Sequence, residues 1–144
     1  MNPQIELPRK MAEAYAVVCK PLCKQLGLPQ TAFDILMFLG NNPEYRTAGD
    51  IVNIRRIKAN LVSVHVDRLV REGYLTRHPV KDDRRKTELH CTARALPVIA
   101  RGKRLQEEFA ARLFAGTDEE TRRVFAAVTE TMMKNLDRIR EEAD

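Results

Sequence analysis

The chain has 144 residues, of which 44% are hydrophobic and 31% are charged, a composition that excludes disordered and membrane-embedded classes. This length allows one domain with its own core and is short for a two-domain enzyme. Three unpatterned cysteines, an N-terminus without an apolar core and no apolar run of about 20 residues predict a cytoplasmic protein without disulfides or membrane contact.

The formal net charge of +5 is concentrated in one segment. Residues 55–86 contain ten Lys or Arg and four Asp or Glu, a local charge of +6, whereas the rest of the chain sums to −1. A segregated basic region of this kind predicts a polyanionic partner.

The N-terminal part of the chain predicts two helices. Apolar residues recur at three- and four-residue steps from Leu7 to Leu26, which indicates an amphipathic helix. Pro21 lies inside this segment and predicts a kink or break near Lys20. A second helix should follow Pro29 and end before Gly40.

A short third helix and a longer fourth helix follow. Thr47 is a candidate cap for a helix that reaches about Ile54. Lys58 to Glu72 has the most regular pattern, and Gly73 is suited to end it in a left-handed cap. Its apolar stripe consists of Val62, Val66, Leu69 and Val70. The opposite side carries Asn60, Val64, Asp67, Arg68 and Arg71, with Ser63 at its edge.

The C-terminal half predicts a hairpin and two long helices. Residues 74–79 and 87–91 have the composition of two strands, and the basic stretch between them would form the tip. Thr92 is expected to cap a helix through about Phe114, and Thr117 with Glu120 has the capping-box spacing that begins a last helix. The inward candidates are Leu96, Ile99, Leu105, Phe109 and Leu113, then Val124, Val128, Met132, Leu136 and Ile139.

This order of elements predicts a mainly α fold with a small β-hairpin wing. A first amphipathic helix, three shorter helices, a hairpin with a basic tip and two long helices form a winged helix-turn-helix with added terminal helices. One helix with an exposed polar face fits the major groove, and arginines on a protruding hairpin are well suited to phosphates.

Residues 47–92 carry a more specific pattern. Asp67-Arg68-Leu69, Gly73 and Arg77 lead into the wing, which carries Asp83-Arg84-Arg85 and ends at Thr92. In these motifs and their spacing the chain resembles the multiple-antibiotic-resistance regulator (MarR) family of transcription factors.

The resemblance implies one MarR-like domain over residues 1–144. Residues of about 30–92 would form the DNA-binding lobe, and about 1–28 and 93–144 the dimerisation helices of a homodimer on a palindromic site of double-stranded DNA. Together with the basic segment, it suggests as DNA-binding residues Arg55, Arg56, Lys58, Asn60, Ser63, Val64, Arg68, Lys81, Arg84 and Arg85. Asp83 would stabilise the wing by steadying an arginine.

Three residues depart from the family pattern. Val64 stands where relatives often have a polar or basic residue, so base readout could rest on a thymine methyl or on neighbouring side chains. Cys91 replaces the usual leucine, and Ala95 replaces a glycine.

The function expected from the sequence is therefore a sequence-specific DNA-binding transcriptional regulator, with repression as its mode of action. The resemblance also implies a small aromatic or anionic effector, for which Tyr15, Phe33, Met37 and Phe38 are candidate pocket residues, although such a stripe is more often core. Two alternatives remain open: a redox-sensing regulator that uses Cys19 or Cys23, and a winged-helix protein-interaction module without DNA readout.

Catalytic and metal sites are not expected. The sequence has no glycine-rich phosphate loop, no His-Glu-x-x-His spacing and no nucleophile beside a base, so we predict neither an enzyme nor a cofactor. His78, His90 and Cys91 border the wing, but adjacent strand residues point to opposite faces, which argues against a shared metal ion.

Overall fold

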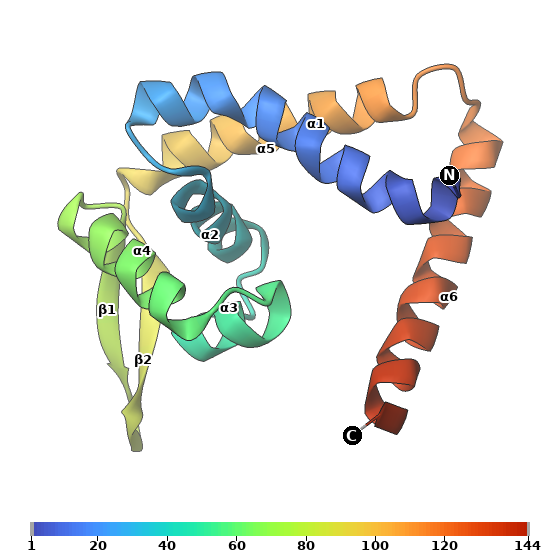
Figure 1. The fold of residues 1–144 in the computed structure, drawn as a ribbon. Coiled ribbons are helices and arrows are strands. Elements are labelled where there is room, and N and C mark those ends of the chain that lie inside the picture. Colours follow the sequence, from blue (N-terminus) through green and yellow to red (C-terminus); the bar gives the residue numbers. More distant parts are fainter. Residues whose placement is uncertain (1, 144) are drawn as a thin grey trace. The chain divides into compact units, whose positions relative to one another are not determined.

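The computed structural model describes residues 2–143, which form six helices and one two-stranded antiparallel sheet (Figure 1). The elements are α1 (Pro3–Leu26), α2 (Gln30–Asn41), α3 (Ala48–Arg55), α4 (Ala59–Arg71), β1 (Leu75–Val80), β2 (Asp83–Cys91), α5 (Ala95–Leu113) and α6 (Glu119–Ala143). The predicted fold class, mainly α with a β-hairpin wing, is confirmed. The chain divides into two compact units, the first ending at Phe109 and the second beginning at Ala110.

Helix α1 is continuous, so the predicted break near Lys20 is wrong. The helix begins at a side-chain cap from Asn2 and ends at Gly27, which adopts the left-handed conformation (φ 67°). Pro21 removes one backbone donor, but Cys19, Leu22 and Cys23 around it are buried in the core. Packing of this face therefore holds the helical backbone through the proline.

Helix α2 extends one residue beyond Gly40, where the sequence predicted its end. A Cβ atom at Gly40 would lie 2.8 Å from Cγ2 of Ile99, so the glycine allows α5 to pack closely on α2. The Asn42 side chain donates a hydrogen bond to the Phe38 carbonyl (2.9 Å) and closes the helix. Gly40 therefore allows a close contact between α2 and α5 and does not end α2.

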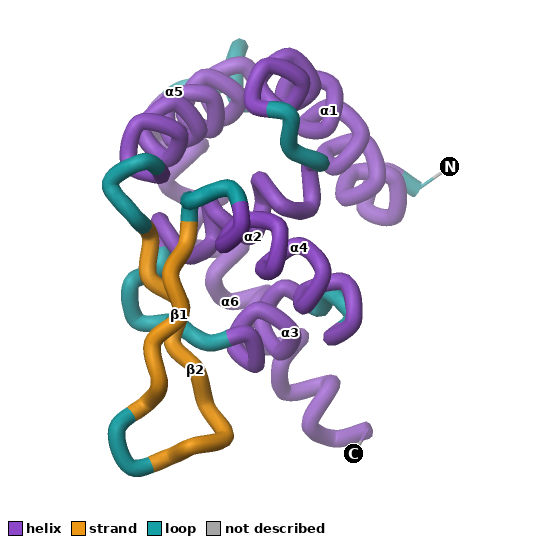
Figure 2. The backbone as a smooth tube through the Cα atoms, turned by 90° about the vertical axis from the view of Figure 1, so that its left-hand side faces the viewer, coloured by secondary structure: helices purple, strands orange, loops and turns teal. Residues whose placement is uncertain are grey.

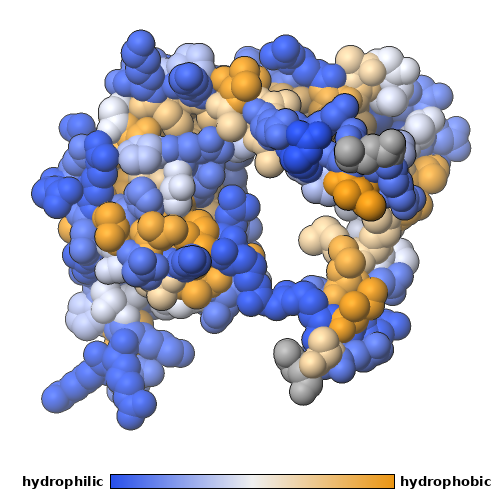
Figure 3. All heavy atoms as spheres, in the orientation of Figure 1, coloured by the Kyte–Doolittle hydropathy of each residue, from blue (hydrophilic) through white to orange (hydrophobic). Residues whose placement is uncertain are grey.

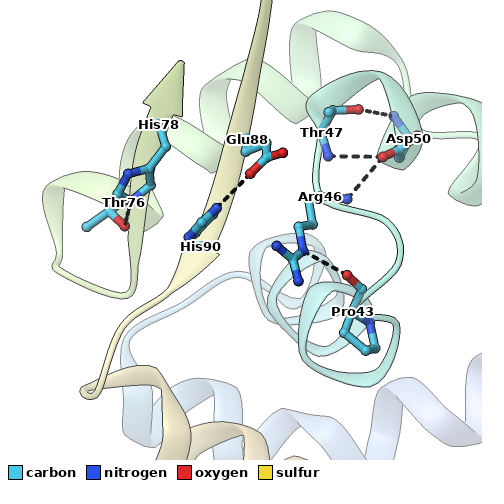
Figure 4. Close-up of polar contacts among 8 residues, drawn as sticks. All are labelled: Pro43, Arg46, Thr47, Asp50, Thr76, His78, Glu88 and His90. Atoms are coloured by element: carbon cyan, nitrogen blue, oxygen red, sulfur yellow. Dashed lines mark hydrogen bonds and ion pairs between the residues drawn. The ribbon is translucent and has the colours of Figure 1, made fainter. Parts of the chain in front are cut away.

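Helices α3 and α4 form where the sequence predicts them. Thr47 Oγ1 accepts a hydrogen bond from the Asp50 amide (3.1 Å), and Asp50 Oδ2 accepts one from the Thr47 amide (3.1 Å; Figure 4). This capping box begins α3. In α4 the buried positions Val62, Val66 and Leu69 belong to the predicted stripe.

The hairpin starts and ends as expected, but its tip is shorter than predicted. Strand β2 begins at Asp83, which pairs with Val80, and only residues 81–82 form the turn. Because the next pair is Pro79 with Thr87, residues 84–86 lie within β2 but have no partner on β1 and form an irregularity in the ladder. The predicted loop over residues 80–86 is therefore too long, because the pair Val80–Asp83 closes the hairpin beyond the unpaired basic residues. Asp82 takes the turn's left-handed conformation (φ 74°).

The root of the hairpin is joined to the beginning of α3. Thr47 forms an isolated antiparallel bridge with Glu88, and the Leu89 amide donates to the Arg46 carbonyl (2.6 Å). These contacts fix where the wing leaves the lobe, and Figure 2 shows the hairpin reaching past the neighbouring helices α3 and α4.

Helix α5 begins later than predicted. Thr92 does not cap it: its hydroxyl donates to the Gly73 carbonyl (2.6 Å), which joins the hairpin to the end of α4. Of the inward candidates, Ile99 is buried and Leu105 and Phe109 are partly buried. The predictions for Leu96 and Leu113 are wrong, because both side chains are exposed in the single chain.

Helix α6 is capped by a residue other than the predicted one. Asp118 Oδ1 accepts the Thr121 amide hydrogen bond (2.7 Å), whereas the Thr117 hydroxyl donates to the Phe114 carbonyl (2.6 Å). The five predicted apolar positions of α6 lie at helical spacing but are 49–60% exposed, so their prediction as inward residues is wrong for the single chain. They appear as hydrophobic atoms along α6 in Figure 3.

The core lies in the first unit, between the winged-helix lobe and the helices α1 and α5. Its fully buried large side chains are Phe33, Ile35, Leu36, Met37, Ile51, Val62, Leu69 and Leu75. Two side-chain hydrogen bonds join α1 to α5: Arg101 donates to Gln25 (2.6 Å) and Gln106 to Tyr15 (3.0 Å). Among residues 2–143, no helix is both long and apolar enough to span a bilayer.

Candidate nucleic-acid interface

The outward face of α4 is the first part of the candidate interface. Val62, Val66 and Leu69 hold the other side of the helix in the core, so Asn60, Ser63 and Val64 are all exposed. At about 100° per residue, Val64 lies near the middle of this face and Asn60 lies one turn before it. The predicted DNA-contacting residues of the helix are thus accessible, with one exception.

Arg68 is that exception. Its Nη2 donates a hydrogen bond to the Gly27 carbonyl (2.5 Å), and its Nε lies 3.5 Å from Oε2 of Glu72. The guanidinium therefore joins α4 to the end of α1, where helix carbonyls lack partners. This internal contact competes with the DNA contact predicted for Arg68.

An ion pair connects α4 to the wing. The Arg77 guanidinium on β1 bonds to the Asp67 carboxylate on α4. Both residues belong to the sequence motif that suggested the family resemblance, and their contact orients the hairpin relative to the outward face of the helix.

The wing carries four exposed cations, Lys81, Arg84, Arg85 and Lys86. In the part of the chain that the structure describes, none of them forms an ion pair with a carboxylate. The hydrophilic tip projects from the lobe in Figure 3. Cations in this arrangement are free to contact phosphates.

Asp83 stabilises the backbone of the wing. Its Oδ1 accepts a hydrogen bond from the Arg85 amide (3.0 Å), and its carboxylate contacts no arginine side chain among the described residues. The sequence predicted that Asp83 steadies an arginine; the contact found here is to the main chain of that arginine.

Three further predicted DNA-contacting residues lie between α3 and α4. Arg55 ends α3, Arg56 follows in the left-handed conformation (φ 56°), and Lys58 immediately precedes α4. All three side chains are exposed. They flank the start of α4, where free backbone N–H groups also favour a phosphate.

One face of the hairpin carries a polar cluster that the sequence did not reveal. The His78 and His90 rings are tilted by 33° with their centroids 4.2 Å apart. His78 contacts the Thr76 hydroxyl (2.9 Å), and His90 contacts the Glu88 carboxylate (2.9 Å; Figure 4). The hydrogen bond from His90 lowers the pKa of Glu88 below its ordinary value. In the sequence, the only indication of this cluster is the alternate spacing of positions 76 and 78 and of positions 88 and 90. Which of these residues face each other depends on the strand register, which the sequence does not give.

The same cluster brings His78 of β1 and His90 of β2 together on one face. This pair could not be predicted from adjacent residues of one strand, which point to opposite faces. Among residues 2–143, however, no group of three or more His, Cys, Asp or Glu side chains is arranged to hold a metal ion.

A cavity of about 280 Å³ lies beside α2 in the first unit. Three of the four predicted pocket residues line it: Tyr15, Met37 and Phe38. Phe33 does not line it and is fully buried in the core. The other lining residues are Asp34, Asn41, Asn42, Arg55 and Gln106, which the sequence pattern did not single out because they are polar.

Burial controls the ionisable groups around this cavity. It raises the pKa of Tyr15 to about 12 and also raises that of Asp34, against the attraction of the Arg55 guanidinium. The cavity is therefore lined by the neutral phenol of Tyr15, by the Asp34 carboxyl, which ionises less readily than usual, and by the Arg55 guanidinium.

The α1 cysteines do not have the environment of reactive thiols. Cys19 and Cys23 are buried, and burial raises the pKa of both, that of Cys23 to about 11. A reactive cysteine requires an accessible, stabilised thiolate. The structure therefore does not favour the redox alternative.

Comparison with known proteins identifies the winged-helix segment. A family model described as "MarR family" matches residues 26–86, from the end of α1 to the basic part of the wing. A search of curated proteins finds no match.

Solved structures of MarR proteins share the fold of the whole chain. A MarR protein from Peptoclostridium difficile has 18% identity and a TM-score of 0.84, with 99% of this chain and 93% of that one covered. A MarR family regulator from Listeria monocytogenes complexed with 26mer DNA has 18% identity and a TM-score of 0.83, with 94% and 90% covered. The MepR–DNA complex of S. aureus has 17% identity and a TM-score of 0.73, with 90% and 95% covered.

The matched segment contains most of the lobe described above, including α4, the Asp67–Arg77 ion pair and the basic residues of β2. Residues 26–86 thus match the MarR family model, and the chain shares its fold with solved MarR structures.

Proposed function

We propose that the protein is a sequence-specific double-stranded DNA-binding regulator that represses transcription as a homodimer on a palindromic site. The observation that carries this proposal is the outward face of α4 beside a wing whose cations lack carboxylate partners among the described residues. A groove-sized helix and a neighbouring phosphate-binding hairpin have complementary roles on a duplex. The Listeria and S. aureus relatives are in complexes with DNA, which supports the same assignment.

Within this proposal, residues 30–92 form the DNA-binding lobe, and the segments 1–28 and 93–144 join two copies. The exposed apolar face of α6 supports a homodimer, because a row of five apolar side chains in water is costly unless a second surface covers it. A two-fold pair would present two copies of α4 to two half-sites. The location we propose is the cytoplasm, where such a regulator would reach its DNA.

The cavity beside α2 is the proposed effector site. Tyr15 and Phe38 offer aromatic surface, and Arg55 offers a cation for a small aromatic or anionic molecule. Arg55 also precedes α4, so a ligand on its guanidinium would act on the segment that leads into the DNA-contacting helix.

The proposal is tested by titrating labelled DNA from the protein's own upstream region at several salt concentrations. We expect salt-dependent binding, because phosphate contacts release counterions. Arg85→Ala should weaken binding to every sequence and reduce the salt slope by about 1, the effect of one lost phosphate contact. Failure of the wild-type protein to bind this DNA at any salt concentration would overturn the proposal.

Arg104→Ala is a matched control. Arg104 is exposed on α5, outside the proposed DNA-binding lobe, and the substitution removes the same charge. If both variants lost affinity equally, net charge alone would explain the loss and the wing would have no specific role.

A further inference from the structure

The middle of the outward α4 face is apolar. Val64 is 61% exposed and Leu61, three residues earlier, is 44% exposed. Residues three apart on a helix are neighbours, so the two side chains form one small apolar surface. This surface lies on a helix whose flanks and neighbouring wing are strongly basic.

The polar side chains around this surface do not supply an arginine for base readout. Arg68 bonds to the Gly27 carbonyl, and Asp67 is engaged by Arg77. Arg71 ends the helix, almost two turns beyond Val64. The commonest contact to guanine, a bidentate arginine or lysine on O6 and N7, therefore has no donor at the centre of this face.

The major groove offers an apolar group only at thymine, whose C5-methyl projects into it. We propose that Val64, with Leu61 beside it, recognises a thymine methyl and makes each half-site depend on an A·T pair at that position. Asn60, one turn before Val64, supplies an amide that can bond to a neighbouring adenine at N6 and N7. This inference rests on the proposed DNA-binding function and names the base that its central contact reads.

The test begins with the full-length protein and a pool of random duplexes, from which bound sequences are enriched. Each thymine of the enriched site is then replaced by deoxyuridine, which lacks only the C5-methyl group. At one symmetric position we expect an affinity loss of about fourfold per half-site, the effect of one buried methyl group. At the other positions the loss should be small.

The Val64→Ala variant tests whether Val64 causes the affinity loss on removal of the thymine methyl group. The variant should bind the thymine and deoxyuridine duplexes with equal affinity at the critical position, because the methyl contact is already lost. Ile54→Ala, which also truncates an exposed apolar side chain but lies on α3, should retain the full thymine preference. Because Val64 is largely solvent-exposed, its truncation leaves the core unchanged.

The outcomes distinguish this inference from the proposed function. If no sequence is enriched and DNA affinity is absent at low salt, the proposed function is wrong. If a site is enriched but no deoxyuridine affects binding, or if Val64→Ala keeps the wild-type thymine preference, the function stands and the valine readout is wrong.

Discussion

At the scale of single residues, the thiols of α1 illustrate how burial decides chemistry. Burial raises the pKa of Cys23 to about 11 from an ordinary value of 9.0. At pH 7.5, roughly one molecule in 3,000 would then carry the Cys23 thiolate. Well below pH 9 the thiol is neutral in both folded and unfolded chains and has no effect on stability. As the pH rises from about 9 to 11, the unfolded chain loses the proton first and the folded state is progressively destabilised.

We therefore expect a thiol reagent such as 5,5′-dithiobis(2-nitrobenzoate) to react slowly with Cys19 and Cys23 in the native protein at pH 7.5. Cys91 is only half-buried and should react first. The number of thiols released is measured by absorbance before and after addition of denaturant, and Cys91→Ser should remove the fast component. Fast reaction of either remaining thiol in that variant would restore the redox alternative.

At this scale, the sequence predicted which side chains of α4 are exposed but did not predict which residues they contact. The exposed positions of α4 follow from its period, and Asn60, Ser63 and Val64 are found on the predicted side. The bond from Arg68 to Gly27 spans 41 residues of sequence and depends on the packing of two helices, so no local pattern could predict it.

At the scale of elements, close packing of α5 against α2 depends on a glycine. A Cβ atom at Gly102 would lie 2.3 Å from the Met37 sulfur and 3.1 Å from Cζ of Phe33, both deeply buried. Alanine is favoured over glycine in a helix by up to about 1 kcal/mol, but overpacking a filled core costs about 1–3 kcal/mol. The second effect should be larger.

Gly102→Ala is accordingly expected to destabilise the protein by about 1–2 kcal/mol, measured by urea denaturation at a fixed protein concentration. Gly49→Ala in α3 is the matched control, because its Cβ would have only an ordinary contact with Thr47, at 3.7 Å. That variant should be unchanged or more stable by about 0.5–1 kcal/mol. A stabilised Gly102→Ala variant would show that Met37 can move aside.

The elements themselves were largely predictable. Helical periods and turn residues indicated all six helices and the hairpin, because each pattern is local. The errors arose at ends and at prolines: α1 continues through Pro21, α2 includes Gly40, and β2 contains the basic residues expected in a loop. In α1 and α2 tertiary packing outweighed a local signal, and in β2 an irregularity of the register places residues 84–86 within the strand without a partner.

At the scale of the whole molecule, the exposed stripe of α6 leads to a prediction about assembly. Placing a charge in this stripe, as in Met132→Asp, would bury a carboxylate in the proposed dimer interface, where an unpaired charge is strongly unfavourable. We expect the wild-type protein to sediment as a dimer and Met132→Asp as a monomer in analytical ultracentrifugation. DNA affinity should fall together with dimerisation.

Lys134→Asp provides the control, because residue 134 lies about 200° around the helix from residue 132. This variant should remain dimeric. A wild-type protein that sediments as a monomer at micromolar concentration would contradict the homodimer and require another partner for the stripe.

The two attachments of the hairpin have a mechanical consequence. Arg77 joins β1 to α4 through Asp67, and the Leu89 amide joins β2 to the Arg46 carbonyl, two residues before α3. With both strands tethered near the root, the hairpin cannot swivel separately from the helix beside it. We therefore expect a tilt of α4 to move Arg84 and Arg85, at the far end of the hairpin, by more than it moves Arg77 near the root.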